Sequence, residues 1–284
     1  MIDTHAHLNF NAFEKDCAQV IERSFNNGIK FIVNVGSQLD TSKKAIELAD
    51  NFKNLPPHLI NKDTFGAKIT KLAPIRCGGL YAAVGLHPIH VGDEAFDFEE
   101  YKKLAQNKKV VAIGETGLDY FHIKEKKLLE LQKEVFLSHI KLAKELDLPL
   151  ILHCRDSKEE PGKAYKEMLE ILKKERVNKG VIHCFSANLD IAKEFLDMGF
   201  YVGFTGIVTF AKELESVISE IPLDKILSET DCPYLAPVPY RGKRCEPWHV
   251  KFTIEKIAQI KGIAFPEIEK QTEQNAINFF GLKD

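Results

Sequence analysis

The chain has 284 residues, of which 44% are hydrophobic and 28% charged, a composition typical of a soluble globular protein that buries a full core. This length suits either two ordinary domains or one large α/β barrel. The formal net charge of -2 shows none of the basic excess of many nucleic-acid-binding proteins, so a contact with nucleic acid has to come from a local patch or from bound metal ions.

Short apolar runs alternate with longer amphipathic segments along most of the chain. Several runs, such as KFIVNVG at 30–36, are almost continuously apolar, which is typical of strands buried on both faces of a parallel sheet. The predicted strands, in chain order, are Ile2–His7, Lys30–Gly36, Leu80–His87, Val110–Glu115, Pro149–Cys154, Gly180–Cys184, Phe200–Thr205 and Lys225–Asp231.

Helical patterns fill the intervals between these strands. In the longest, apolar residues recur at intervals of three, four or seven and so form one stripe. The predicted helices are Phe13–Asn27, Asp40–Asn51, Phe98–Asn107, Lys124–Leu146, Gly162–Arg176, Leu189–Met198, Ala211–Ile221 and His249–Lys261, with a ninth at Pro266–Phe280. Eight strands alternating with eight helices predict an α/β fold of right-handed units closed into a TIM-type (β/α)₈ barrel. A doubly wound open sheet is the structural alternative.

One segment interrupts the alternation. Residues 54–79 separate the second helix from the third strand and are longer than a usual αβ loop. We expect residues 1–284 to form a single barrel with this segment as a surface insertion on the face opposite the catalytic one.

The cysteines and the first residues indicate the cellular compartment. Six cysteines form no CxxC pair, which favours reduced thiols in a cytoplasmic enzyme over a disulfide framework. The opening MIDTHAHLNF has neither a basic region nor an apolar run, and no stretch of 18 apolar residues predicts a membrane span.

Metal-ligand side chains gather at the ends of five predicted strands. Two histidines two residues apart end the first strand and point the same way, because strand side chains alternate. The six candidates are His5, His7, Glu115, His153, His183 and Asp231. Barrel enzymes place catalysis at these strand ends, and neutral imidazole and carboxylate are good ligands for divalent transition metals. Six ligands exceed the usual three of one catalytic ion, so two ions that share a carboxylate fit better.

The same alternation predicts which way the side chains beside the candidate ligands point. Cys154, Cys184 and Cys232 each come directly after a candidate ligand and should point outward as small buried residues. Asp3 and Glu229 should face inward, either as hydrogen-bond partners of the ligands or as ordinary buried polar groups.

The motifs, taken together, resemble the TatD family of deoxyribonucleases within the amidohydrolase superfamily. The matching strings are DTHAHL at 3–8, GLHP at 85–88, GETGLDY at 114–120, ILHCRD at 151–156, IHCFS at 182–186 and ETDCPYLAPVPYRGKR at 229–244. They span nearly the whole chain except the 54–79 segment, and the last string is the most diagnostic.

The resemblance implies hydrolysis of DNA phosphodiesters, as a 3′–5′ exonuclease on single strands. It implies one ion on His5, His7, Glu115 and Asp231 and a second on Glu115, His153 and His183, so that Glu115 bridges them. The ligand set accepts zinc, manganese or magnesium. The expected partner is single-stranded DNA at its 3′ end, and the expected state is a monomer or weak oligomer.

Asp231 is our candidate for the general base, because it would reach both a metal and the attacking water. Arg155 follows the fifth predicted strand and His87 ends the third, and both are candidates to bind substrate. Arg241 and Arg244 form a basic loop that could grip phosphates, and Tyr240 before them could stack on a base, although a solvated basic loop is the simpler interpretation.

Two other functions remain open from the sequence. The same barrel could hydrolyse an amide or ester bond in a small molecule or an aminoacyl group. A scaffold without catalysis is the third interpretation, and the complete set of six ligands argues against it.

Overall fold

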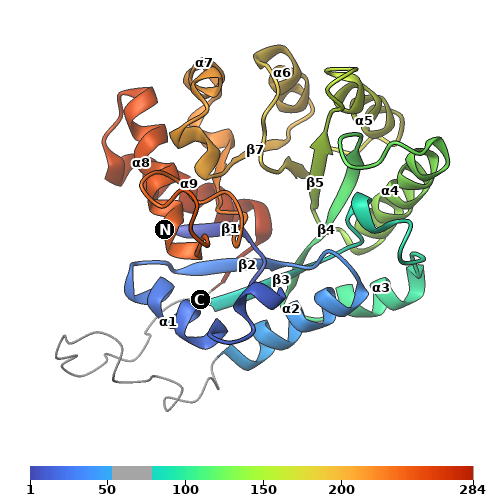
Figure 1. Cartoon of the computed structure of the whole chain (residues 1–284), viewed down its shortest axis with the longest axis horizontal. Coiled ribbons are helices and arrows are strands. Elements are labelled where there is room, and N and C mark those ends of the chain that lie inside the picture. Colours follow the sequence, from blue (N-terminus) through green and yellow to red (C-terminus); the bar gives the residue numbers. More distant parts are fainter. Residues whose placement is uncertain (53–78, 284) are drawn as a thin grey trace.

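Eight parallel strands form the centre of the molecule, which the computed structural model describes over residues 1–52 and 79–283 (Figure 1). Each strand pairs with the next one in the chain. The strands are β1 Ile2–Ala6, β2 Phe31–Val35, β3 Gly79–Val84, β4 Val110–Asp119, β5 Leu150–Arg155, β6 Gly180–Ile182, β7 Tyr201–Phe204 and β8 Ile226–Ser228.

Backbone contacts join the two edges of the sheet. Ala6 forms an isolated parallel bridge with Cys232, which follows β8. The amide of His7 donates to the carbonyl of Cys232 at 2.8 Å, and the amide of Asp231 donates to that of His5 at 2.9 Å. The predicted TIM-type (β/α)₈ barrel is thus confirmed, and the open-sheet alternative is wrong.

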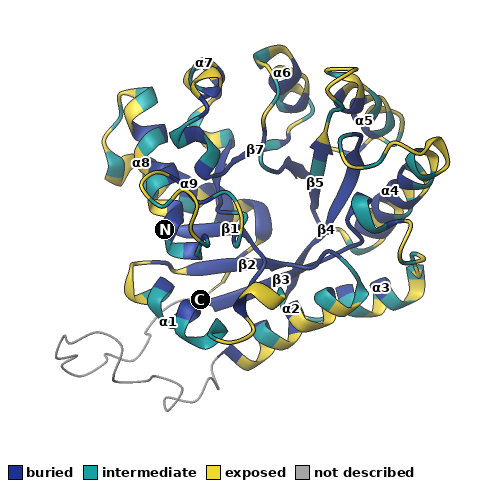
Figure 2. Cartoon of the chain, viewed as in Figure 1, coloured by how far each residue is buried: buried dark blue, intermediate teal, exposed yellow. Residues whose placement is uncertain are grey.

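Helices surround the strands and turn their polar faces outward, so that burial is concentrated in the strands and on the inner helix faces (Figure 2). The helices are α1 Cys17–Asn26, α2 Leu39–Asn51, α3 Phe98–Ala105, α4 Lys126–Leu146, α5 Lys163–Lys174, α6 Leu189–Asp197, α7 Glu215–Glu220, α8 Val250–Lys261 and α9 Phe265–Phe280. Across residues 1–52 and 79–283, none of them combines the length and apolarity needed to cross a membrane.

In the part of the chain that the structure describes, the apolar core has two parts. The larger packs the strands against the surrounding helices. The smaller includes Phe31, Val33 and Val35, which alternate along β2, together with Phe279 and Phe280 at the end of α9. The ninth helix therefore adds aromatic side chains to the smaller of the two cores.

Several predicted boundaries of helices and strands were wrong. The segment predicted as a helix over Ala211–Ile221 begins with the 3₁₀ turn Lys212–Leu214, and only α7 is α-helical. β1, β6 and β8 end before the predicted ligands His7, His183 and Asp231. β3 ends before His87, whereas β4 continues past Glu115 to Asp119.

Glycine permits the longer β4. Gly117 has a φ of 142°, and a Cβ there would lie 2.1 Å from the carbonyl oxygen of His153 on β5. Only a residue without a side chain can lie this close to the neighbouring backbone. The two strands therefore stay paired up to the contact between Asp119 and Arg155. The prediction for residues 54–79 lies outside the described residues, apart from Gly79, at which β3 begins.

Candidate metal centre

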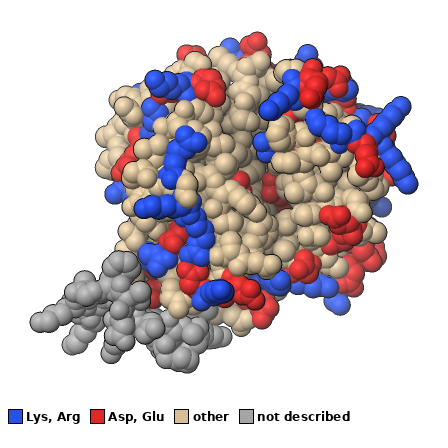
Figure 3. All heavy atoms as spheres, viewed as in Figure 1, with Lys and Arg blue, Asp and Glu red and all other residues tan. Residues whose placement is uncertain are grey.

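A cavity of about 660 Å³ lies where the carboxyl ends of the strands meet. Residues from all eight strands or the loops that follow them line it, from His7 after β1 to Tyr234 after β8. Figure 3 shows acidic residues in the middle of this side of the molecule, surrounded mainly by uncharged ones. The cavity thus occupies the catalytic face of a barrel.

The first group of ligand atoms comes from β1 and β8. Nε2 of His5 and Nε2 of His7 lie 3.1 Å apart. Asp231 places Oδ1 3.2 Å from Nε2 of His7 and 3.9 Å from Nε2 of His5. The three residues lie close enough together to hold one ion.

The second group is built around Glu115 on β4. Its Oε1 lies 2.9 Å from Nδ1 of His153, 3.4 Å from Nε2 of His87 and 3.9 Å from Nε2 of His183. Its Oε2 faces the first group, at 3.3 Å from Nε2 of His5. One carboxylate therefore faces both groups.

The structure brings all six predicted ligands together and adds His87, which the sequence suggested only as a substrate contact. Glu115, His87 and His153 form a ligand-type group of their own. Imidazole nitrogens and carboxylate oxygens converge here. This donor set fits divalent ions of the zinc and manganese class.

Burial and neighbouring charges set the protonation of the cluster. Burial disfavours the charged form of Glu115, but the surrounding imidazoles, His87 and His5 first and then His153 and His183, together hold its pKa well below the usual range. Burial, reinforced by His183, lowers the pKa of His5, and burial lowers that of His87 to about 4. These two imidazoles are therefore neutral at pH 7, the state in which imidazole binds a metal.

A second layer of carboxylates supports the imidazoles. Asp119, at the end of β4, places Oδ2 3.0 Å from Nε2 of His153 and is fully buried. Glu229 places Oε1 2.8 Å from Nδ1 of His183 and accepts the amide of Cys184 at 2.6 Å. Carboxylates in this position fix the orientation of metal-binding imidazoles.

Sequence reasoning found Glu229 but missed Asp119. The predicted strand ended at Glu115, whereas a strand that continues places every second residue, and so Asp119, on the same face. Asp3 takes the ordinary buried role, because its carboxylate accepts Thr230 Oγ1 at 2.6 Å and the Thr230 amide at 2.9 Å.

The cysteine predictions were correct in part. Cys154 and Cys232 are buried in the larger core, although Cys154 also borders the cavity. Cys184, expected to point outward, lines the cavity instead and forms a ligand-type group with His183 and Asp231. Alternation fails there because β6 ends at Ile182 and Cys184 has a φ of 47°.

Two of the candidate substrate contacts lie at the cavity. His87 lines it, and so does Arg155, whose guanidinium packs 4.1 Å from the ring centroid of Phe121. Arg241 is exposed and packs over the ring of Phe210 at 3.8 Å.

The other two candidates, Tyr240 and Arg244, make contacts away from the cavity. Tyr240 stacks on His249 with 4.4 Å between ring centroids, and it packs against the larger core. Arg244 binds both carboxylate oxygens of Asp16, at 2.8 and 2.6 Å, and donates to the carbonyl of Ala12. Neither side chain lines the cavity, because each is committed to contacts within the fold.

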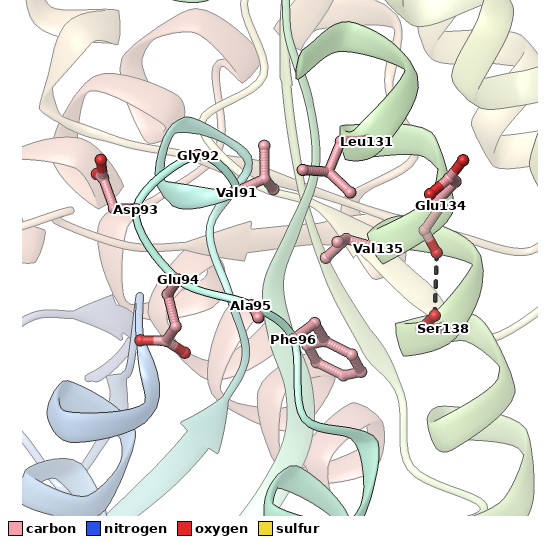
Figure 4. Close-up of a pocket in the computed structure, with 10 residues that line it drawn as sticks. All are labelled: Val91, Gly92, Asp93, Glu94, Ala95, Phe96, Leu131, Glu134, Val135 and Ser138. Carbon is pink, nitrogen blue, oxygen red and sulfur yellow. Dashed lines mark hydrogen bonds between the residues drawn. The ribbon is translucent and has the colours of Figure 1, made fainter. Parts of the chain in front are cut away.

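A second cavity, of about 430 Å³, lies between residues 91–96 and α4 (Figure 4). Glu94 at its edge already accepts the amide of Leu39 and the hydroxyl of Tyr101. Each of the four ligand-type groups in residues 1–52 and 79–283 instead includes at least one residue that lines the first cavity.

Comparison with known proteins identifies the relatives of this chain. Residues 2–59 and 61–281 match the family model described as TatD related DNase. The match runs through most of the 54–79 segment, which the motif resemblance left out. The chain is 39% identical to the uncharacterized metal-dependent hydrolase YabD of Bacillus subtilis, with 99% of each chain covered.

A second relative and a solved structure agree with this match. The uncharacterized metal-dependent hydrolase YcfH of Escherichia coli K12 is 34% identical, over 99% of this chain and 96% of its own. The crystal structure of YjjV, a TatD homologue from Escherichia coli K12, superposes with a TM-score of 0.83 at 26% identity and covers 100% of this chain and 98% of its own.

Proposed function

The chain belongs to the TatD family of metal-dependent hydrolases, and we propose that it is a deoxyribonuclease that removes nucleotides from the 3′ end of single-stranded DNA. The observation that carries the proposal is the two-sided contact of Glu115. Oε2 faces His5 at 3.3 Å and Oε1 faces His153 at 2.9 Å, so that one carboxylate can serve two ions. A pair of ions is a recurrent solution for phosphodiester cleavage.

In this proposal one ion is held by His5, His7, Glu115 and Asp231, and the other by Glu115, His153 and His183. When bound, zinc, manganese or magnesium ions would polarise the phosphate and lower the pKa of the attacking water. Asp119 and Glu229 orient two of the imidazoles from behind.

Asp231 is the proposed general base. Burial disfavours its charged form, but the hydrogen bond with His7 and the charge of His183 outweigh it and lower the pKa of Asp231. The carboxylate is therefore ionised at neutral pH, the state in which it can accept a proton. Its side chain lines the cavity and keeps 17% of its surface exposed, so that a substrate can reach it.

The cavity supports a single-stranded substrate. At about 660 Å³ it has the size of a pocket for a small molecule, which suits a single terminal nucleotide better than a duplex. Arg155 at the cavity is the proposed contact to a phosphate next to the scissile one, because a guanidinium can bind phosphate with two parallel hydrogen bonds.

The test uses purified protein loaded separately with Mn²⁺, Mg²⁺ and Zn²⁺. Single-stranded and duplex oligonucleotides, labelled at the 5′ or 3′ end, are incubated beside amide and carboxylic-ester substrates. We expect a ladder of 5′-labelled products from the single strand, which chelation abolishes. Turnover of the amide or ester panel without cleavage of any oligonucleotide would contradict the proposal and favour a hydrolase of small molecules.

A further inference from the structure

One wall of the cavity is apolar, although the floor is lined by charged groups. Ile207 after β7 and Tyr234 and Leu235 after β8 line this wall, and Phe10 after β1 continues it. Phe10 stacks on the ring of His7, with 4.3 Å between ring centroids and 15° between planes. Apolar surface therefore begins directly beside the candidate metal ligands.

Tyr234 is the most exposed part of this wall. With 56% of its surface accessible, it is one of three exposed large hydrophobic side chains in residues 1–52 and 79–283. Its amide donates to the carbonyl of Asp231 at 3.0 Å, so a tight turn holds the ring next to the proposed base. A large aromatic ring left open to solvent inside a reactive cavity indicates a ligand with a flat apolar face.

The backbone holds this wall in place. A Cβ on Gly206 would lie 2.4 Å from the carbonyl oxygen of Leu235, so the loops after β7 and β8 are in direct contact. Leu235 has a φ of 53°, which a branched residue adopts only at a cost. The amide of Val238 further along the loop donates to Thr209 Oγ1 at 3.0 Å. The wall is therefore preformed.

The opposite side of the cavity has a different chemistry. There the guanidinium of Arg155 and, at 5.8 Å, the ammonium of Lys158 lie over the ring of Phe121. The cavity thus offers the cation of Arg155 on one side, ligand-type groups on the floor and apolar surface on the other side. A nucleotide carries complementary groups in a matching order: an anionic phosphate, which a cation or metal ion binds, and a flat base, which packs on apolar surface.

We propose that Tyr234, with Leu235 and Ile207, forms a subsite for the nucleobase attached to the reacting phosphate. The inference rests on the proposed function, because it names the part of a DNA substrate that this site binds. Stacking on an aromatic side chain tolerates any base, so the subsite favours nucleotides over other phosphates without reading sequence.

The test measures affinity instead of turnover. Titration calorimetry compares thymidine 5′-monophosphate with 2-deoxyribose 5-phosphate on the Mn²⁺-loaded protein, and the ratio of the two dissociation constants reports the base alone. We expect the nucleotide to bind tighter by on the order of 5- to 100-fold. Tyr234→Ala should bring the ratio close to one, and Tyr234→Phe should preserve it. Val238→Ala is the matched control, because Val238 is 48% exposed on the same loop.

Two results would overturn the subsite: a ratio near one in the unchanged protein, or a ratio that survives in Tyr234→Ala. The oligonucleotide assay separates this failure from failure of the proposed function. Cleavage of DNA without a preference for thymidine 5′-monophosphate would remove the subsite and keep the nuclease. A preference that depends on Tyr234 in a protein that cleaves no DNA would keep the subsite and remove the nuclease.

Discussion

Asp119 Oδ2 lies 3.0 Å from Nε2 of His153, and the other nitrogen of that ring, Nδ1, lies 2.9 Å from Glu115 Oε1. The carboxylate therefore determines which nitrogen of His153 faces Glu115. Backbone amides of Phe121 and His122 also donate to Asp119 Oδ1, at 2.9 and 2.8 Å. Burial disfavours the charged form, but the contacts with His153 and His122 together outweigh it and lower the pKa of Asp119, so it stays ionised.

Replacing Asp119 with Asn should weaken metal binding at the His153 side of the centre by about 10- to 100-fold, the usual effect of losing such a partner. Calorimetric titration of the metal-free protein would measure the change. His122→Gln is the control, because His122 contacts the same carboxylate from a side chain that is 47% exposed. Wild-type affinity for both ions in Asp119→Asn would show that Asp119 has no positioning role.

How far the sequence predicts this site depends on how regular the strands are. The alternation of apolar runs and amphipathic segments was sufficient for the barrel, and the HxH spacing placed His5 and His7 on one side of β1. Asp119 was missed because a strand that holds Gly114 and Gly117 looks, from sequence alone, as though it ends at Glu115. Cys184 was misplaced because the alternation of a strand does not continue into a loop with a left-handed residue.

The basic loop shows a second limit of prediction from the sequence. Arg241 and Arg244 are indistinguishable in the string RGKR, yet only the structure shows that Arg244 already binds Asp16 with both of its terminal nitrogens. The sequence shows that an arginine is present. Whether its guanidinium can bind a phosphate depends on whether a carboxylate from another part of the chain already pairs with it.

Glu115→Ala should remove both ions, whereas Glu229→Gln should weaken only the ion held through His183. The reason is that Glu115 faces both ligand groups and Glu229 contacts a single imidazole. Elemental analysis after gel filtration in low metal would give the number of ions retained per chain. A Glu115→Ala protein that keeps two ions would refute the shared carboxylate.

Arg155→Ala and Arg244→Ala should fail in different ways. Arg155→Ala should weaken binding of an oligonucleotide and reduce the slope of affinity against salt by about one phosphate contact. Arg244→Ala should leave that slope unchanged and lower the free energy of unfolding by on the order of 1 kcal/mol, because it loses a half-exposed bidentate ion pair. Fluorescence anisotropy at several salt concentrations, together with thermal unfolding, distinguishes the two. A lower salt slope in Arg244→Ala would restore its role as a phosphate ligand.

Metal binding should release protons. Burial opposes the charged form of His153, but Asp119 and Glu115 raise its pKa to about 9, and Glu229 and Glu115 likewise raise the pKa of His183 to about 10. Both imidazoles are therefore protonated on both nitrogens and positively charged at pH 7 in the metal-free protein, whereas metal ligation needs the neutral form. Affinity should rise with pH, by about tenfold per pH unit for each released proton, and level off above the higher pKa.

Calorimetry in buffers that differ in ionisation enthalpy would count the protons released. Asp119→Asn should reduce the count, because it removes the group that contributes most to the raised pKa of His153. Affinity that is flat between pH 6 and 9, with no proton released, would show that the imidazoles are neutral before the metal arrives.

Asp231→Asn tests the proposed general base. The substitution keeps the size of the side chain and one oxygen that can bind a metal, but the amide cannot accept a proton at neutral pH. We expect turnover at saturating metal to fall by on the order of 10²- to 10⁴-fold, the usual contribution of a positioned base. The occupancy of both ions at saturation should stay close to that of the unchanged protein.

Asp119→Asn is the matched comparison, because both substitutions turn an aspartate of the same centre into its amide, while Asp119 contacts His153 from behind and does not lie among the six ligands. If Asp119 only positions a ligand, excess metal should restore most of the turnover of its variant. Excess metal should not restore Asp231→Asn, since its ions are already bound and the missing function is proton transfer. Recovery of Asp231→Asn to nearly full turnover in the same titration would reject it as the base and leave it a metal ligand alone.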